Sequence, residues 1–163
     1  MSDYISLGVF FVLTASAAIT GGFFAPGPWY FDLNKPSWTP PGWAFPVVWT
    51  ILYVMIAIAG WRAYQAQGLG LLIAVWGLQL VLNAGWSWIM FGKKRIGWAL
   101  VDAGGMWVSI AAFIALAWNA SPISAQLFLP YLLWVTIAFV LNLRILQLNP
   151  GGHGALSART NPS

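Results

Sequence analysis

Residues 69–92, LGLLIAVWGLQLVLNAGWSWIMFG, decide the fold class of this chain. The stretch carries no charged side chain, and about 20 apolar residues in a helix are enough to cross the hydrocarbon core of a bilayer. It is too long and too weakly amphipathic for a helix of a soluble protein, whose apolar residues gather on one face. We therefore expect residues 69–92 to cross a membrane as a helix.

Four further runs of the same kind extend this expectation to the whole chain, at about 4–25, 43–62, 97–119 and 124–147. Lipid offers no hydrogen-bond partners, so a spanning segment must pair its backbone within itself, as a helix does. The first run lacks the basic start of a cleaved signal peptide, so we expect it to be retained. The predicted fold class is an all-α integral membrane protein. Residues 1–149 form one domain, a bundle of five transmembrane helices, and 150–163 form a mobile tail.

The composition excludes most other classes of protein. Of the 163 residues, 60% are hydrophobic and 6% are charged, whereas soluble domains average about 25% charged residues. The chain has no cysteine, and its one histidine, His153, lies in the Gly-rich tail. Disulfides, zinc sites, Ser-His-Asp catalysis and a core haem ligand therefore have no residues to build them. We expect no metal, no required cofactor and no nucleic-acid partner, because the net charge of +4 comes from few and scattered cations.

The basic residues favour one orientation in the membrane. Five helices place the termini on opposite sides, and the side with the loops at 26–42 and 92–97 and the tail carries most cations: Lys35, Lys93, Lys94, Arg95, Arg144 and Arg159. The other side carries only Arg62. The positive-inside rule then predicts an outside N-terminus and a cytoplasmic C-terminus.

The connection between the first two helices is expected to be a structured lid. Six of the ten prolines lie in residues 26–46, PGPWYFDLNKPSWTPPGWAFP, together with several aromatic side chains. Flexible linkers are polar and rich in Gly and Ser, so this restricted segment should pack on the helix ends.

Polar side chains inside the third run need partners. Trp76, Gln79, Asn83 and Trp86 recur at helical spacing and share one face. Lipid cannot satisfy an amide or an indole N–H, so this face turns to the bundle. Hydrogen bonds between helices and a ligand pocket both account for it. Asp102 is expected to pair with Lys35 or Arg95 rather than to relay protons.

Aromatic faces converge from two more helices, with Trp49 and Tyr53 on the second and Tyr131 and Trp134 on the fifth. Pro130 should kink the fifth helix and open space beside Trp134. An apolar pocket with flat rings and a few donors suits a planar hydrophobic ligand entering under the lid. The alternative is that the twelve tryptophans anchor the helices at the membrane interfaces, as the positions of Trp29, Trp38, Trp43, Trp61, Trp98 and Trp118 near predicted helix ends allow.

Three stretches carry a resemblance to a known family: 29–53, WYFDLNKPSWTPPGWAFPVVWTILY; 77–102, GLQLVLNAGWSWIMFGKKRIGWALVD; and 129–142, LPYLLWVTIAFVLN. They resemble the translocator proteins, also called peripheral-type benzodiazepine receptors or tryptophan-rich sensory proteins, in their bacterial form. The resemblance implies a five-helix bundle with a lid over a ligand pocket, in a bacterial membrane that is either inner or outer. The implied ligands are porphyrins and other tetrapyrroles of the haem type, cholesterol, isoquinoline carboxamides and benzodiazepines.

The resemblance also implies roles for particular residues. Trp49 and Trp134 match two tryptophans of the family that take part in porphyrin breakdown, and Ala138 lies in the sterol-sensitive part of the fifth helix. Family members often dimerise through the third helix, so a homodimer is an expected partner beside membrane lipid and the small molecule. The expected ligand-binding residues are Trp38, Trp49, Tyr53, Asn83, Trp86, Trp107, Tyr131, Trp134 and Ala138.

One departure from the family bears on the ligand. The end of the fifth helix reads LNLRILQLN over residues 141–149, and Leu143 stands where animal members carry the tyrosine of a cholesterol motif. A tetrapyrrole therefore fits better than cholesterol. Three functions remain open: a receptor or sensor for tetrapyrroles, their light- and oxygen-dependent degradation through Trp49 and Trp134, and transport of a tetrapyrrole or sterol.

Overall fold

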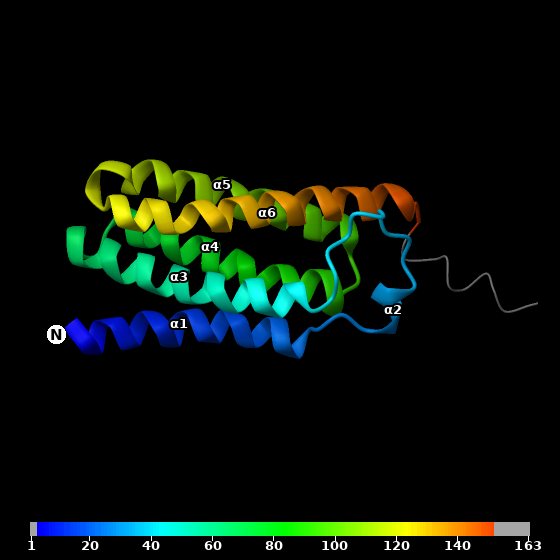
Figure 1. The fold of residues 1–163 in the computed structure, drawn as a ribbon, viewed down its shortest axis with the longest axis horizontal. Helices are drawn as coiled ribbons and strands as arrows, with labels where there is room; N and C mark the ends of the chain where they lie inside the picture. Colours follow the sequence, from blue (N-terminus) through cyan, green and yellow to red (C-terminus); the bar gives the residue numbers. More distant parts are fainter. Residues whose placement is uncertain (1–2, 152–163) are drawn as a thin grey trace, which may run out of the picture.

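The computed structural model describes residues 3–151, in which helices are the regular secondary structure and no strand occurs (Figure 1). Five long helices form the bundle: α1 (Asp3–Phe23), α3 (Ala44–Gln67), α4 (Leu71–Ser87), α5 (Ile96–Ala120) and α6 (Pro122–Leu148). With α4 extended to Gly92 by a short π-helix, all five are long and apolar enough to cross a membrane. The predicted five-helix fold class is confirmed. Residues 152–163, which hold His153, Arg159 and most of the predicted tail, lie outside the described residues.

Consecutive long helices run antiparallel, as the short connections at 68–70 and 93–95 and the single residue Ser121 require. The beginning of α1 therefore lies at one end of the bundle. The connection at 24–43, the turn at 93–95 and the last turn of α6 lie together at the other end (Figure 1). We call this second end the lid end. Arg62 lies near the opposite end. The lid end carries the other five described cations: Lys35, Lys93, Lys94, Arg95 and Arg144.

The third span differs from the single α-helix predicted over 69–92. It begins at Leu71, and its last turn is the π-helix η1 (Trp88–Gly92). The backbone N–H of Lys93 bonds to the carbonyl of Trp88 at 2.8 Å, five residues back, so this turn is one residue wider than an α-turn. Hydropathy cannot report this widening, because both helix types present the same apolar side chains to lipid.

The predicted lid contains a helix that the sequence reading missed, α2 (Pro28–Phe31). Pro28 occupies its first turn, where a residue without an N–H is tolerated and φ is already helical. Trp29, Tyr30 and Leu33 of the lid pack on an apolar cluster at the lid end of the bundle. Its buried members include Met90, Leu141 and Ile145, and Phe45 at the start of α3 packs on the same cluster. The lid is a packed structure, as its proline content predicts.

The outer face of the bundle is apolar. Val81 on α4, Val101 on α5 and Leu133 on α6 are all more than 60% exposed. Soluble proteins rarely expose apolar surface that is contiguous over so large an area, so this surface is the one that faces lipid. The bundle buries its polar side chains inward, and these define the site described next.

Candidate functional site

A chain of hydrogen bonds crosses the centre of the bundle and joins three helices. The hydroxyl of Tyr53 on α3 donates to Oδ1 of Asn83 on α4 at 2.8 Å, and Nδ2 of Asn83 donates to the hydroxyl of Tyr131 on α6 at 3.1 Å. Tyr131 donates in turn to Oε1 of Gln79 at 2.9 Å, and Nε2 of Gln79 donates to the carbonyl of Trp76 at 2.8 Å. Every bond runs in the same donor-to-acceptor direction. We call Tyr53, Asn83, Tyr131 and Gln79 the polar relay.

Aromatic rings enclose the relay on the α3 side. The indole of Trp49 stacks on the ring of Tyr53 with centroids 5.4 Å apart, and it meets Tyr131 edge-on at 6.1 Å. Tyr131 is fully buried and also contacts Phe128 edge-on. Helical periodicity brings these groups together, because Trp49 and Tyr53 lie one turn apart on the face of α3 that meets α6. Four of the predicted ligand-binding residues therefore form one cluster: Trp49, Tyr53, Asn83 and Tyr131.

Trp134 lies one turn beyond Tyr131, toward the lid end. Its ring packs edge-on against Phe45 at the start of α3, with centroids 5.6 Å apart. Its indole Nε1 is buried and has no hydrogen-bond partner among the described residues. A buried donor left unpaired costs about 1–3 kcal/mol, so an acceptor that reached this N–H would recover that free energy.

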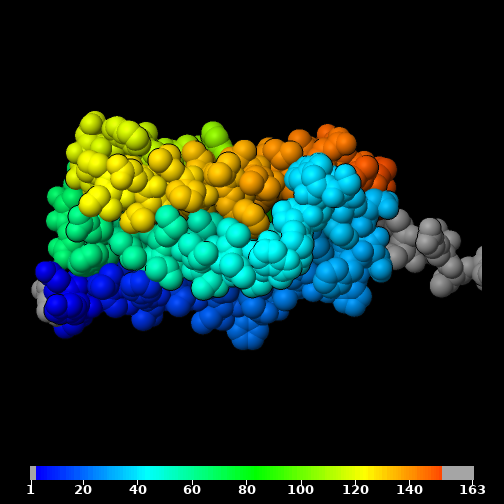
Figure 2. All heavy atoms as spheres, in the orientation of Figure 1, coloured from blue at the N-terminus to red at the C-terminus, as the bar shows by residue number. Residues whose placement is uncertain are grey.

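A groove of about 230 Å³ opens beside Trp134. It follows the seam between α3 and α6 on the face drawn in Figure 2, with Leu52 and Met55 on one wall and Pro130 and Leu133 on the other. Pro130 lies inside α6, and the helix continues on both sides of it. Drug-sized ligands usually occupy about 300–1,000 Å³. A tetrapyrrole would therefore need the lid or the relay to move, or would extend beyond the groove into lipid.

The lid is fastened to the end of α6 by two asparagines. The backbone N–H of Asn34 donates to Oδ1 of Asn149 at 3.0 Å, and Nδ2 of Asn149 donates to the carbonyl of Asn34 at 2.9 Å. The same amide also bonds to the carbonyl of Ile145 at 2.7 Å. We call this pair the Asn latch. Nδ2 of Asn34 adds a longer contact of 3.5 Å to the carbonyl of Leu148, the last residue of α6.

Lys35 closes the lid upon itself. Its Nζ donates to the carbonyl oxygens of Tyr30, Phe31 and Leu33 at 2.8–3.1 Å and lies 4.9 Å from the centre of the Tyr30 ring. Burial raises the pKa of the Tyr30 hydroxyl above its usual range, so that group stays neutral. The ammonium charge is thus held by carbonyl dipoles and a ring face instead of a carboxylate.

The partner predicted for Asp102 is wrong. No ion pair is recorded among residues 3–151, Lys35 is engaged by the lid, and Oδ2 of Asp102 is buried without a hydrogen-bond partner. Oδ1 faces Gly85 across the contact of α4 with α5. The position of a residue along a helix gives its depth in the membrane but not the side of the helix on which it lies. The side chain of Asp102 lies on the side that meets α4, where it contacts no cation of the described residues.

The other expected ligand-binding residues lie apart from the cluster. Trp38 is about half exposed in the lid, and Ala138 is partly buried farther along α6. Nε1 of Trp107 donates to Thr136 on the exposed side of α5 and α6. Nε1 of Trp86 donates to Oδ1 of Asn142 at 3.2 Å within the lid-end cluster. Of the two explanations for the polar face that includes Trp86, a hydrogen bond between helices is the one that matches this contact.

Sequence reasoning missed several residues that shape the site. Asn142 is an amide inside an apolar run, the same signal that singled out Asn83, and its Nδ2 bonds to the carbonyl of Ile96 at 3.0 Å. Asn34 and Asn149 lie in loop-like sequence, where an asparagine is ordinary and gives no signal. The packing of Phe45 on Trp134 depends on where α3 begins, which sequence fixes only to within a few residues.

Comparison with known proteins finds relatives along almost the whole chain. The model of the TspO/MBR family matches residues 9–148. The chain is 40% identical to protein CrtK of Rhodobacter capsulatus over 147 residues, which is 88% of this chain and 92% of that protein. It is 37% identical to a tryptophan-rich sensory protein of Cereibacter sphaeroides, over 90% of this chain and 93% of the relative. It is also 37% identical to the translocator protein of Sus scrofa, over 77% and 78% of the two chains.

Proposed function

The chain belongs to the TspO/MBR family, and from that premise we propose that it is a membrane receptor for planar hydrophobic ligands, tetrapyrroles in particular. Family membership supports the coarser part of this statement, a sensor or receptor role in a membrane. The finer part, the ligand and its place, rests on the chemistry of the site. Isoquinoline carboxamides and benzodiazepines, flat and apolar with few acceptors, belong to the same ligand class.

The observation that carries the proposal is the unpaired indole N–H of Trp134 beside an apolar groove. The groove walls supply apolar contact, and Trp49, Tyr53 and Tyr131 supply ring faces and edges behind it. Aromatic pairs add about 0.5–1.5 kcal/mol each beyond the burial of area. A ring system with an acceptor at its edge would stack in this setting and accept a hydrogen bond from Nε1 of Trp134.

The direct test is a titration of purified protein in detergent with protoporphyrin IX. We expect saturable quenching of tryptophan fluorescence, and an affinity about tenfold lower in Trp134→Phe, which loses the hydrogen bond and part of the ring contact. Trp118→Phe is the matched control, because Trp118 is half exposed at the end of α5 that is far from the lid end. Linear quenching, or equal affinities for wild type and Trp134→Phe, would contradict the proposal.

A second candidate is light- and oxygen-dependent breakdown of the bound porphyrin. It is favoured by the positions of Trp49 and Trp134, the two tryptophans that resemblance assigns to this chemistry, on facing stretches of α3 and α6. Under illumination in air, the Soret band should bleach faster with wild type than with Trp49→Phe/Trp134→Phe, once both are saturated. Equal bleaching in both proteins leaves the receptor role alone.

A further inference from the structure

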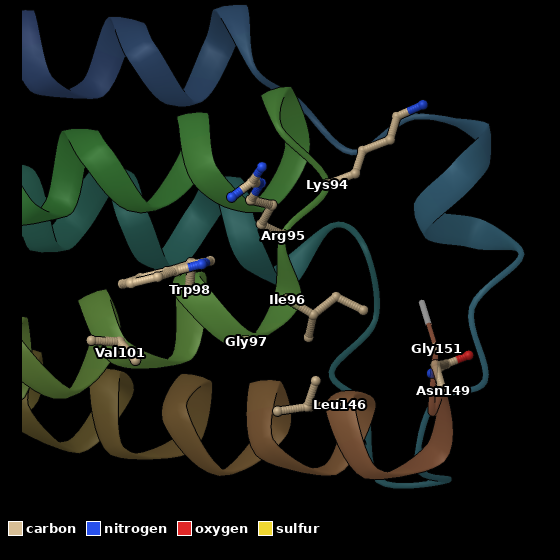
Figure 3. Close-up of a pocket in the computed structure, with 9 residues that line it drawn as sticks. All are labelled: Lys94, Arg95, Ile96, Gly97, Trp98, Val101, Leu146, Asn149 and Gly151. Atoms are coloured by element: carbon tan, nitrogen blue, oxygen red, sulfur yellow. The ribbon is translucent and has the colours of Figure 1, made fainter. Parts of the chain in front are cut away.

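A second groove, distinct from the Trp134 site, lies at the lid end between the start of α5 and the end of α6 (Figure 3). Its volume is about 480 Å³. Ile96, Trp98 and Val101 line it from α5, and Leu146 of α6 and Asn149, directly after that helix, line it from the other side. Apolar atoms make up nearly all of its walls, so it is not a site for a free, fully hydrated ion.

The rim of this groove is basic. Lys94 and Arg95 line it directly, Lys93 precedes them in the chain, and no acidic residue is among the lining side chains. Figure 3 shows Arg95 next to Trp98 and Lys94 extended away from the apolar floor. Neither cation forms an ion pair within residues 3–151, whereas Lys35, at the same end, is saturated by carbonyl groups. The charge at this rim is available to an external anion.

The start of α5 adds donors to the same place. Arg95 occupies the N-cap position of α5, and its side chain makes no capping hydrogen bond to the helix. The first N–H groups of a helix have no partner within it, and the helix dipole places partial positive charge there. Phosphate groups bind well to this combination, so the rim suits the phosphate of a lipid headgroup.

The groove also lies at the depth where a lipid changes from head to tail. The apolar span of α5 begins at Ile96, directly after the cations, so the rim is at the membrane interface and the walls extend into hydrocarbon. Trp98 is 62% exposed and Val101 is 64% exposed, so both side chains face the lipid side. A tryptophan at this depth is typical of the interfacial belt.

We propose that this groove binds one anionic phospholipid. Arg95, Lys94 and the first N–H groups of α5 hold the phosphate, and an acyl chain lies along Trp98, Val101 and Leu146. The occupant is a lipid rather than a soluble phosphate because the walls below the cations are apolar and open toward the bilayer. Since Asn149 of the Asn latch forms part of the wall, the bound lipid lies against the residue that fastens the lid.

The test uses the full chain in mild detergent, with phosphatidylglycerol and phosphatidylcholine of equal acyl length as probes and native mass spectrometry to count bound lipid. We expect one phosphatidylglycerol to bind in preference to phosphatidylcholine. A basic residue near a membrane surface is worth about a fivefold gain in affinity for anionic lipid. Lys94→Gln/Arg95→Gln should therefore weaken that binding about 25-fold. The matched control Arg62→Gln/Arg144→Gln removes the same charge from residues that do not line the groove and should change that binding less than twofold.

A second pair of variants tests the apolar part of the site without changing charge. Val101→Trp fills the groove and should displace the lipid, while Val81→Trp places the same ring at a comparably exposed position on α4 and should not.

Equal losses in the two charge variants would overturn the proposal in favour of nonspecific attraction. Displacement by glycerol phosphate together with unchanged binding in Val101→Trp would overturn it in favour of a soluble anion. No preference for phosphatidylglycerol over phosphatidylcholine would overturn it outright.

Discussion

Tyr131 is the residue on which the centre of the bundle depends. It is fully buried, it accepts a hydrogen bond from Asn83, and it donates one to Gln79. Single hydrogen bonds between transmembrane helices average only about 0.6 kcal/mol, because partners are also found in the unfolded state within the membrane. The Tyr131 hydroxyl serves two amides at once, so its removal leaves two buried polar groups short of a partner.

We therefore expect Tyr131→Phe to lower the free energy of unfolding in detergent by about 1–3 kcal/mol. Tyr64→Phe is the matched control, because the Tyr64 ring packs on Phe10 but no hydrogen bond of its hydroxyl is recorded within residues 3–151. Unfolding followed by circular dichroism, with both variants in the same detergent, gives the comparison. Equal stabilities of the two variants would show that the relay contributes nothing to folding.

The sequence predicted part of this cluster and failed on its neighbour. Trp49, Tyr53, Asn83 and Tyr131 meet as expected, because helical spacing and the avoidance of lipid by polar groups both act on the same residues. Asp102 carries the same signal, a polar group in an apolar run, yet it faces Gly85 instead of a cation. An isolated polar residue has no periodic partners on its own helix, so nothing in the sequence fixes its direction.

At the level of helices, close packing is decided by one glycine. A Cβ atom added to Gly60 on α3 would lie 2.5 Å from Nε1 of Trp76 on α4 and 2.8 Å from the Phe10 ring on α1. The indole cannot withdraw freely, because its Nε1 donates to the carbonyl of Ile56 at 2.9 Å. Three helices therefore meet where only a hydrogen fits. Small residues favour such approaches in membranes, but the sequence does not say which of many glycines serves this purpose.

Gly60→Ala should destabilise the protein by about 1–3 kcal/mol, as overpacking of a tight core does. Gly77→Ala provides the control, since a Cβ at that position on α4 meets nothing within 4 Å. There alanine should be neutral or slightly stabilising, because it is the better helix former. Thermal unfolding in detergent measures both, and a Gly60→Ala protein as stable as wild type would contradict the close packing.

The lid is the element whose attachment is most easily changed. Asn149→Ala removes three recorded hydrogen bonds, two of them to the backbone of Asn34. We expect faster amide hydrogen exchange in residues 24–43 and faster association of porphyrin, with little change in exchange inside the long helices. Gln147→Ala, an exposed neighbour that bonds only to Arg144, is the control. Unchanged exchange in the lid would show that the side chain of Asn149 does not hold it closed.

Over the whole molecule, the fold follows from the sequence more directly than the site does. Five apolar runs of about 20 residues are long enough to span a membrane as helices, which pair their backbone within each segment. The short connections at 68–70, 93–95 and 121 then make those neighbouring helices antiparallel. The lid helix α2, the π-turn η1 and the Asn latch were not predicted. Each depends on local backbone geometry or on a contact between residues more than a hundred positions apart, and hydropathy contains neither.

Charge asymmetry across the molecule predicts its orientation. Because the lid end carries most cations, it should face the cytoplasm. The chain has no cysteine, so single cysteines report topology without background. In intact cells, a membrane-impermeant maleimide should label Gln67→Cys but label Ser37→Cys only after permeabilisation. The reverse pattern would invert the orientation.

The central claim is that a planar ligand binds between α3 and α6 beside Trp134. The most direct measurement is crosslinking with a porphyrin that carries a diazirine, followed by peptide mapping. The account predicts crosslinks on residues 45–55 of α3 and 130–137 of α6, reduced by excess unmodified protoporphyrin IX and in Trp134→Phe. Crosslinks spread over lipid-facing positions such as Leu78 and Val81 of α4, and unaffected by competitor, would contradict it.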